Sequence, residues 1–211
     1  MVYKVLLIDD HPIVRHGLAA LISSEKDMEI FGQAQNAEEA ISLLSKALPD
    51  IAIVDLSLED MSGLDLLRYL NSQYPELPLL VLSMYDEKVY GYRAIKAGAK
   101  GYVMKQEATE HLIQAIRTVL QGEIYLSQSL AFELAKKKLG QGSGTVEEKL
   151  TNRELEVLQL LGHGLGTRQI AEKLCISIKT VETYRSHLKE KLGLETAHQL
   201  VQYAYEFVNK K

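Results

Sequence analysis

Five polar side chains stand directly after short apolar runs, at positions where a buried strand would end. The acids are Asp9, Asp10 and Asp55, and the other two are Ser83 and Lys105. Because ligands of open α/β sheets bind beyond the carboxyl ends of the strands, we expect these groups to converge at one edge. Two carboxylates ~5 Å apart repel by roughly 3 kcal/mol at an effective dielectric of ~20, so three of them need a cation. Oxygen ligands with room for water favour Mg²⁺.

A metal-bound aspartate beside a lysine is also suited to phosphoryl transfer. The carboxylate can accept the phosphoryl group covalently, as an aspartyl phosphate, and the hydroxyl of Ser83 can donate to a phosphoryl oxygen. Any single Asp or Ser at a strand end is more often a turn residue or a helix cap, but their joint placement favours a site. His11 precedes Pro12, a good first helical residue, so we expect His11 to start a helix in solvent and not to bind the metal.

The segments that must position these groups alternate apolar runs with stretches of helical periodicity. The predicted strands cover 4–8, 28–34, 51–55, 79–83 and 101–105, and most are apolar throughout, as strands buried on both faces must be. Between them, residues such as Leu112, Ile116 and Val119 follow the spacing of one buried helical face. This alternation predicts an α/β domain with a five-stranded, parallel, doubly wound sheet.

Composition places the chain among globular proteins. Its 211 residues are 46% hydrophobic and 25% charged, which excludes a disordered or collagen-like chain. The single cysteine, Cys175, excludes an intrachain disulfide and a cysteine metal site, and it favours a reducing compartment. The apolar run at the N-terminus is too short and too acidic for a signal peptide or a membrane span. We therefore expect a cytoplasmic protein with no membrane partner.

Four segments of the first part of the chain carry a family resemblance. They are DDHP (9–12), DLSLEDMSGLDLL (55–67), SMY (83–85) and KAGAKGYVMK (96–105). In this order and spacing they resemble the receiver domain of bacterial two-component response regulators, over residues 1 to about 122. The resemblance implies a flavodoxin-like fold with bound Mg²⁺. It also implies these roles: Asp55 as phosphoacceptor, Asp10 as a direct metal ligand, Asp9 as a ligand mainly through water, Ser57 as a ligand through its backbone carbonyl, Lys105 as the partner of the phosphoryl group, and Ser83 with Tyr102 as the hydroxyl and aromatic switch pair.

The loop after Asp55 departs from the family's pattern. Where the family usually has Met-Pro, this chain has Leu58 and Glu59, followed by Asp60. The loop thereby loses the rigidity of proline and gains two carboxylates near the metal, a change that bears on cation affinity and autodephosphorylation. The other site residues are intact, so the resemblance still implies phosphorylation of Asp55.

A glycine-rich stretch predicts a domain boundary. Residues 127–149 begin with weak helical character and lose it in GQGSG (140–144), a flexible, polar stretch. We therefore place a receiver over 1–122, a linker over 123–148 and an all-α domain over 149–211. From residue 150 onward no strand pattern is present, and four helices are predicted. Their boundaries are marked by capping-box spacing at Thr151 with Glu154 and at Thr196 with Gln199, by simple N-caps at Thr167 and Ser177, and by a C-cap at Gly193.

The third of these helices, within CISIKTVETYRSHLKEKLG (175–193), has two contrasting faces. Val181, Tyr184, Leu188 and Leu192 share an apolar face, and the opposite face is polar with short side chains at its centre. A helix that reads bases needs such a face with flanking cations for phosphates, although a plain amphipathic surface helix has the same pattern. The preceding GLGTRQIAEKL (164–174) completes a helix, a short turn and a second helix.

Residues 150 to about 208 closely resemble the NarL/FixJ (LuxR-type) helix-turn-helix domain. The resemblance implies a recognition helix over 178–191, with Glu182, Thr183 and Ser186 toward bases and Thr167, Lys179, Thr180, Arg185 and Lys189 toward phosphates. Ile178 replaces the family's frequent proline, which is helpful there but not required. The family dimerises through the last helix, where Leu200, Val201, Ala204, Tyr205 and Val208 form an apolar stripe. We expect Cys175 to face the core of this domain.

Together these features predict a phosphorylation-controlled transcription factor and not an enzyme. A sensor histidine kinase would phosphorylate Asp55, and the second domain would bind double-stranded DNA. Residues 146–211 hold ten Lys and Arg against nine Asp and Glu, so one domain alone should bind DNA modestly. We therefore expect a homodimer on DNA, with phosphorylation acting through a receiver dimer or through effector release. Two alternatives stay open: a phosphatase, which would need a second acid where the chain has Ser57, and a regulator that binds DNA or protein without phosphorylation.

Overall fold

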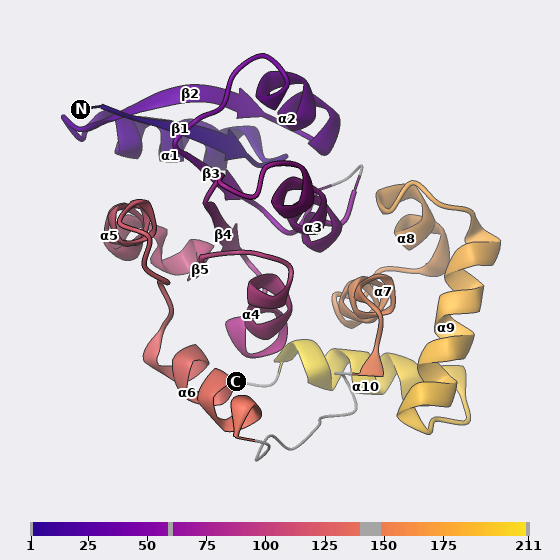
Figure 1. Ribbon diagram of the computed structural model, residues 1–211. Helices are drawn as coiled ribbons and strands as arrows, with labels where there is room; N and C mark the ends of the chain where they lie inside the picture. The colour runs from indigo at the N-terminus through magenta and orange to yellow at the C-terminus, as the bar shows by residue number, and fades with distance from the viewer. Residues whose placement is uncertain (1, 59–60, 140–148, 210–211) are drawn as a thin grey trace. The chain divides into compact units, whose positions relative to one another are not determined.

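The computed structural model describes residues 2–58, 61–139 and 149–209 of the chain (Figure 1). It divides into two compact units, Met1–Gly142 and Ser143–Lys211, which are considered separately below. The departure at Glu59 and Asp60 and the GQGSG stretch lie outside the described residues.

The first unit is built on one parallel sheet, as predicted. Its strands are β1 (Tyr3–Ile8), β2 (Met28–Ala34), β3 (Ile51–Val54), β4 (Leu79–Ser83) and β5 (Gly101–Met104). All neighbours pair in parallel in the order β2-β1-β3-β4-β5, which confirms the five-stranded doubly wound fold. Strands β3 and β5 each end one residue before the predicted point, so Asp55 and Lys105 come directly after them. Lys105 opens the short 3-10 helix η1 (Lys105–Glu107).

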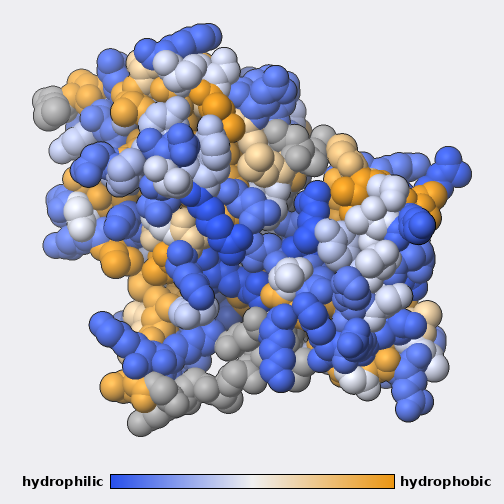
Figure 2. Space-filling model, turned by 45° about the vertical axis from the view of Figure 1, so that its right-hand side comes forward, coloured by the Kyte–Doolittle hydropathy of each residue, from blue (hydrophilic) through white to orange (hydrophobic). Residues whose placement is uncertain are grey.

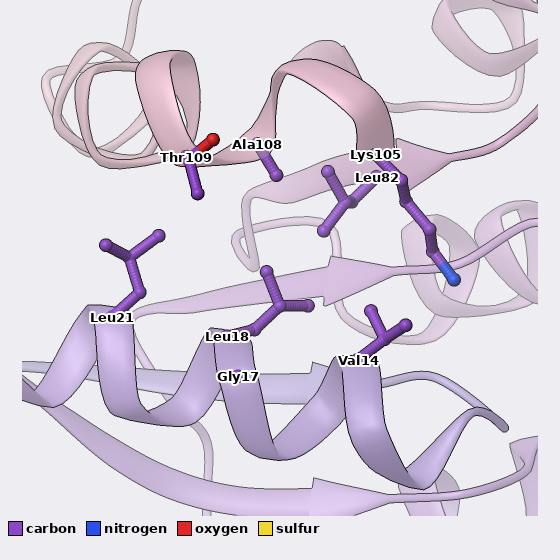
Figure 3. Close-up of a pocket in the computed structure, with 8 residues that line it drawn as sticks. All are labelled: Val14, Gly17, Leu18, Leu21, Leu82, Lys105, Ala108 and Thr109. Atoms are coloured by element: carbon purple, nitrogen blue, oxygen red, sulfur yellow. The ribbon is translucent and has the colours of Figure 1, made fainter.

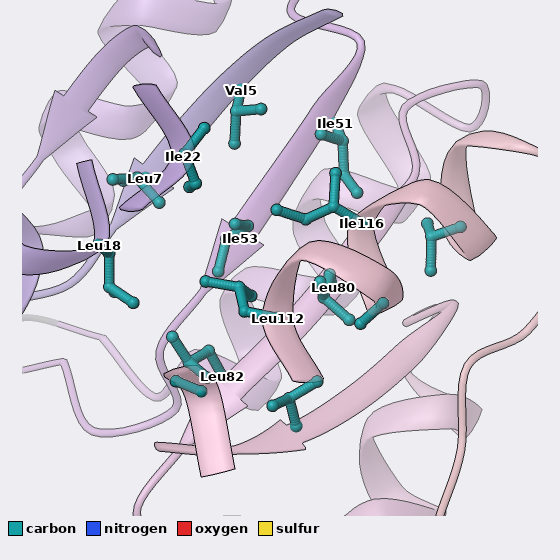
Figure 4. Packing of buried hydrophobic residues seen from close by; sticks show 14 of the residues in the cluster. Val5, Leu7, Leu18, Ile22, Ile51, Ile53, Leu80, Leu82, Leu112 and Ile116 are labelled. Carbon is teal, nitrogen blue, oxygen red and sulfur yellow. The ribbon is translucent and has the colours of Figure 1, made fainter. Parts of the chain in front are cut away.

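Five helices cover the two faces of this sheet. They are α1 (Pro12–Ser23), α2 (Ala37–Leu44), α3 (Gly63–Gln73), α4 (Glu87–Lys96) and α5 (Ala108–Leu120). Alternate strand residues point to opposite faces, so Val5 and Leu7 of β1 join a core cluster with Leu18 of α1 and Ile116 of α5 (Figure 4). Helices α2, α3 and α4 lie on the other face (Figure 1). The burial of both faces explains why the strands are apolar throughout.

Regular structure continues beyond α5 into the segment that we propose as a linker. Tyr125 forms a parallel bridge with β5, at the edge of the sheet. Ser127 caps α6 (Gln128–Lys138), and its hydroxyl also donates to Oε1 of Glu87 in α4. Leu130 is 2% exposed and packs against α4. The first half of this segment is therefore held to β5 and α4 within the first unit.

The second unit consists of α7 (Asn152–Gly162), α8 (Thr167–Lys173), α9 (Ile178–Leu192) and α10 (Ala197–Asn209). Most of the predicted caps are confirmed. The hydrogen bonds of the capping boxes Thr151 with Glu154 and Thr196 with Gln199 are present, Ser177 caps α9, and Gly193 follows α9 in the left-handed conformation. The prediction for Thr167 is wrong, because Gly166 is the N-cap of α8 and Thr167 is its first helical residue.

The surface of the second unit brings one further correction. Cys175 is exposed, because it adopts a φ of 51° in the turn between α8 and α9, so the prediction that it faces the core is wrong. In α10, Leu200 and Ala204 are fully buried, while Val201 and Tyr205 are 42% and 62% exposed. On the face drawn in Figure 2, hydrophilic side chains cover much of both units, and apolar side chains reach the surface in smaller groups. None of the described helices is long and apolar enough to cross a membrane.

Candidate functional site

The acidic residues gather where the strand order of the sheet reverses. Strand β2 lies on one side of β1 and β3 lies on the other, so the loops after β1 and β3 leave a crevice between them. Asp9 and Asp10 follow β1 and Asp55 follows β3. One ligand atom from each of these three, together with a ring nitrogen of His11, lie within 4.8 Å of one another. The structure thus brings together the three carboxylates that the sequence placed at one edge.

Lys105 joins this cluster from the end of β5. Its Nζ lies 2.6 Å from Oδ2 of Asp55 and 2.6 Å from Oδ2 of Asp9. Burial alone would lower the pKa of Lys105, but the charge of Asp55 and hydrogen bonds with Asp55 and Asp9 outweigh it, so the pKa is raised. The side chain is therefore a fixed ammonium ion that offsets one of the three negative charges.

Asp10 is the third carboxylate of this cluster. Burial raises the pKa of Asp10, and the charges of Asp55 and Asp9 add to this effect, while His11 opposes it. Oδ1 of Asp10 is buried, and no described residue gives it a hydrogen bond of suitable geometry. Its cationic neighbour is Nδ1 of His11 at 2.6 Å, which is charged only when the ring is protonated. With a neutral His11, two negative charges stay uncompensated, and oxygen ligands with this charge fit a divalent cation such as Mg²⁺.

His11 is placed partly as the sequence predicted. It is the N-cap residue of α1, directly before Pro12, and its side chain is 54% exposed. The ring nevertheless turns toward the acids instead of standing in solvent, because Asp9 and Asp10 lie in the same turn. Its backbone N–H also donates to Oδ1 of Asp9 at 2.8 Å, which fixes the start of the helix beside the cluster.

Two neighbours hold Asp55 in place. Ser57 donates to its carboxylate twice, from Oγ to Oδ2 at 2.7 Å and from the backbone N–H to Oδ1 at 3.2 Å. Gly63 packs against the same turn: a Cβ there would lie 2.4 Å from Cα of Leu56 and 2.5 Å from the carbonyl oxygen of Asp55. Gly63 was not predicted as part of the site, although a glycine directly before the run LDLL was the available signal.

The predicted switch residues lie together and are buried. Ser83 is 0% exposed and Tyr102 is 1% exposed. Both contact Tyr85: Oγ of Ser83 accepts from its N–H at 3.2 Å, and the hydroxyl of Tyr102 donates to its carbonyl at 2.7 Å. Burial raises the pKa of Tyr102 well above its ordinary value, although a hydrogen bond with Ser83 opposes this. The Tyr85 ring stacks on Tyr90 of α4, with centroids 4.7 Å apart, so Tyr85 links the pair to α4. Sequence reasoning gave Tyr85 no role.

In the second unit, α9 has the two faces that its sequence predicts. Val181 and Leu188 are fully buried, and Tyr184 and Leu192 are half-buried. The exposed residues include four of the predicted DNA contacts, namely Lys179, Glu182, Thr183 and Ser186. Thr180, Arg185 and Lys189 are half-buried at the sides of this face. The hydroxyl of Thr183 donates to the carbonyl of Lys179 at 3.0 Å.

Three of the residues predicted to contact DNA also contact one another within the protein. Oγ1 of Thr167 in α8 donates to Oε1 of Glu182 in α9 at 2.9 Å, and Nη1 of Arg185 donates to the same Thr167 oxygen. Arg185 also lies 3.9 Å from the Glu182 carboxylate. Sequence reasoning did not find this link, because it joins two helices at positions 15 and 18 residues apart.

Family models of known proteins match both parts of the chain. The model described as "Response regulator receiver domain" matches residues 5–117, and the model described as "Bacterial regulatory proteins, luxR family" matches residues 148–204. "Oxygen regulatory protein NreC" of Staphylococcus epidermidis is 37% identical over 209 residues, which cover 95% of this chain and 96% of the relative. The chain is a LuxR-type response regulator. As a member of this family, it is a phosphorylatable DNA-binding protein of a two-component system that controls transcription.

Solved structures of other response regulators are similar to this protein. RcsB from Salmonella enterica serovar Typhimurium, bound to the promoter rprA in the presence of the phosphomimetic BeF3-, aligns with a TM-score of 0.69 and 28% identity. The match covers 97% of this response regulator and 99% of the RcsB chain. A LuxR family response regulator from Aurantimonas sp. SI85-9A1 aligns with a TM-score of 0.61 and 32% identity over 66% of this chain and 99% of that one.

The receiver of this response regulator also has an apolar pocket beside the acidic site. The pocket has a volume of about 250 Å³ and lies between α1 and the start of α5. Its lining includes Val14, Leu18, Leu21 and Leu82, and Figure 3 shows the Lys105 side chain leading away from them toward its charged end. The charged groups of the receiver therefore gather at the strand ends, while this pocket offers mainly apolar contact.

Proposed function

We propose that Asp55 of this response regulator accepts a phosphoryl group from a sensor histidine kinase. The observation that carries the proposal is the position of Nζ of Lys105, 2.6 Å from both Asp55 and Asp9 at the point where strand order reverses. In the transfer, a carboxylate oxygen of Asp55 attacks the phosphorus of phosphohistidine, the N–P bond breaks, and the imidazole keeps the electron pair. Lys105 would stabilise the charge on the transferred group.

The cation of this reaction would be Mg²⁺. The carboxylates of Asp9, Asp10 and Asp55 and the backbone carbonyl of Ser57 would hold it, and their uncompensated negative charge supports this assignment. When bound, Mg²⁺ compensates the charge of an incoming phosphoryl dianion that the acids would otherwise repel. Ser57 additionally orients Asp55 through its two hydrogen bonds.

The output would be a change in DNA binding. The phosphoryl group would draw the hydroxyl of Ser83 toward it, and the change would reach Tyr102 and α4 through Tyr85. We propose that phosphorylation favours a receiver dimer or releases the effector, and that a homodimer then binds double-stranded DNA through α9. RcsB, a structural relative, is described as two dimers bound to two parallel DNAs. The receiver would span 1–122, the linker 123–148 and the effector 149–211, and the protein would act in the cytoplasm.

The test follows phosphorylation and DNA binding in the full chain. Acetyl phosphate with Mg²⁺ should add one phosphoryl group to the wild type in intact-mass spectra, and a chelator should prevent it. Asp55→Asn should stay unmodified and show no gain in affinity for a duplex that the phosphorylated wild type selects from a random-sequence pool. Asp65→Asn changes an exposed acid of α3 that pairs with Arg68, so it should behave as wild type. Undiminished labelling of Asp55→Asn would exclude Asp55 as the phosphoacceptor.

A further inference from the structure

Thr167 joins two residues of α9 in one directed hydrogen-bond chain. The Arg185 guanidinium can only donate, and it donates to Oγ1 of Thr167. The Thr167 hydroxyl has a single proton, which it donates to Oε1 of Glu182 at 2.9 Å. The direction is thus fixed from guanidinium to hydroxyl to carboxylate, and the carboxylate is the end of the chain that faces outward.

Glu182 and Arg185 differ in how far their side chains are exposed to solvent. The Glu182 side chain is 57% exposed, whereas the Arg185 side chain is 17% exposed. An exposed carboxylate on a DNA-facing helix would be repelled by phosphates, and the guanidinium 3.9 Å away offsets part of that repulsion. A guanidinium that is largely covered and already donates within the protein is poorly placed to bind a phosphate. Arg185 is therefore better placed to stabilise the Glu182 carboxylate than to bind a DNA phosphate.

We propose that Thr167 and Arg185 are positioning residues, which hold Glu182 so that its carboxylate reads a cytosine in the major groove. This inference rests on the proposed binding of DNA by α9, and it replaces the phosphate contacts expected for Thr167 and Arg185. A carboxylate can only accept, and the cytosine amino group is the donor that Glu and Asp recognise in the major groove. Holding the carboxylate in advance lowers the ordering cost of that contact.

The test measures base preference at single base pairs. The phosphorylated full chain is titrated with the duplex that the wild type selects from a random-sequence pool, with single-base-pair variants of it, and with a scrambled duplex. Thr167→Val keeps the side-chain shape and removes the donor, so it should lose about tenfold of the preference for C·G at one position per half-site. Its affinity for the scrambled duplex should stay within about twofold of the wild type. Thr167→Ser keeps the hydroxyl and should retain the preference.

Two further variants complete the design. In Arg185→Lys the positive charge is kept and the planar fork is lost, so we expect loss of the same preference with an unchanged salt dependence. A double variant, Thr167→Val with Glu182→Gln, should discriminate between base pairs no worse than Glu182→Gln alone, because both changes remove the same base contact.

Three results would overturn the inference. They are equal weakening of selected and scrambled duplexes by Thr167→Val, full retention of the preference by Arg185→Lys, and independent losses in the double variant. Failure of the wild type to select any sequence would instead contradict the proposed function, so the two failures are distinguishable.

Discussion

Leu130 of α6 occupies the space that a side chain at position 91 of α4 would need. A Cβ on Gly91 would lie 2.6 Å from both methyl carbons of Leu130. Lys137, further along α6, places its Nζ 4.2 Å from the ring centroid of Tyr92. With the hydrogen bond from Ser127 to Glu87, these contacts fix one face of α6 on α4, the helix that follows the proposed switch residue Ser83. Any movement of α4 must therefore be accommodated by α6.

Gly91→Ala should loosen this contact. Alanine improves helix propensity by about 1 kcal/mol, but the added methyl group overpacks the Leu130 site at a cost of about 1–3 kcal/mol. We expect faster hydrogen exchange in residues 128–138, while the sheet keeps its protection. Hydrogen exchange read by mass spectrometry measures both regions in one experiment.

Gly17→Ala in α1 is the matched control. A Cβ at Gly17 would meet nothing within 4 Å, so the same substitution should stabilise the chain by up to about 1 kcal/mol and leave α6 unchanged. If Gly91→Ala leaves the exchange of α6 as slow as Gly17→Ala does, the packing of Leu130 does not hold α6 in place.

Ser83→Ala should separate phosphorylation from its consequence. The acids, Lys105 and Ser57 remain, so Asp55 can still be labelled by acetyl phosphate, although more slowly. The hydroxyl that would report the phosphoryl group to Tyr85 and Tyr102 is gone, so the gain in DNA affinity should be largely lost. Intact mass and DNA titration are measured on the same sample. A labelled Ala variant with the full gain in affinity would show that Ser83 is not part of the switch.

Lys191→Met should make the second unit less stable in a pH-dependent manner. Burial alone would raise the pKa of Glu154, but hydrogen bonds from Lys191 and Thr151 outweigh it, so the pKa lies below its ordinary value. A lowered carboxyl pKa stabilises the fold above the unfolded pKa, and this stability is lost as pH falls through the folded pKa. We expect a loss of about 1 kcal/mol at pH 7 that shrinks below pH 4.5.

The pH series can be measured by denaturant unfolding of the full chain, with hydrogen exchange in α7 to locate the change. Lys173→Met, an exposed position in α8, is the control and should show no such dependence. A constant difference between Lys191→Met and wild type from pH 7 to pH 3 would mean that the 2.7 Å contact of Lys191 with Glu154 does not set the pKa of Glu154.

The acidic site could be predicted because its residues lie at the ends of buried strands. An apolar run followed by Asp55 or Lys105 identifies the carboxyl end of a buried strand, and parallel topology then brings those ends together. Neither the bond from Ser127 to Glu87 nor the contact of Leu130 with Gly91 follows from periodicity, because each joins segments about 40 residues apart. Cys175 was misplaced because its direction depends on a positive φ, which a non-glycine residue does not reveal in sequence.

Lys189 and Glu182 should respond in opposite ways when α9 binds DNA. Lys189 offers only a cation, so Lys189→Ala should weaken the selected and scrambled duplexes about equally and lower the salt slope by roughly one unit. A Lys189→Arg variant keeps the charge and should restore the slope. A slope unchanged by Lys189→Ala would show that this side chain does not lie at a phosphate.

Glu182→Ala removes a negative charge from the side of α9 that we propose to face DNA, leaves the Thr167 hydroxyl without its acceptor and removes the carboxylate 3.9 Å from Arg185. Non-specific binding should therefore stay the same or strengthen, because repulsion from phosphates falls. The preference at one base pair per half-site should drop by about 1–3 kcal/mol, the usual value of a lost base contact. Titrations against the selected and scrambled duplexes at two salt concentrations separate the two effects. Equal losses on both duplexes would mean that α9 enters the groove with a different face from the one that carries Glu182.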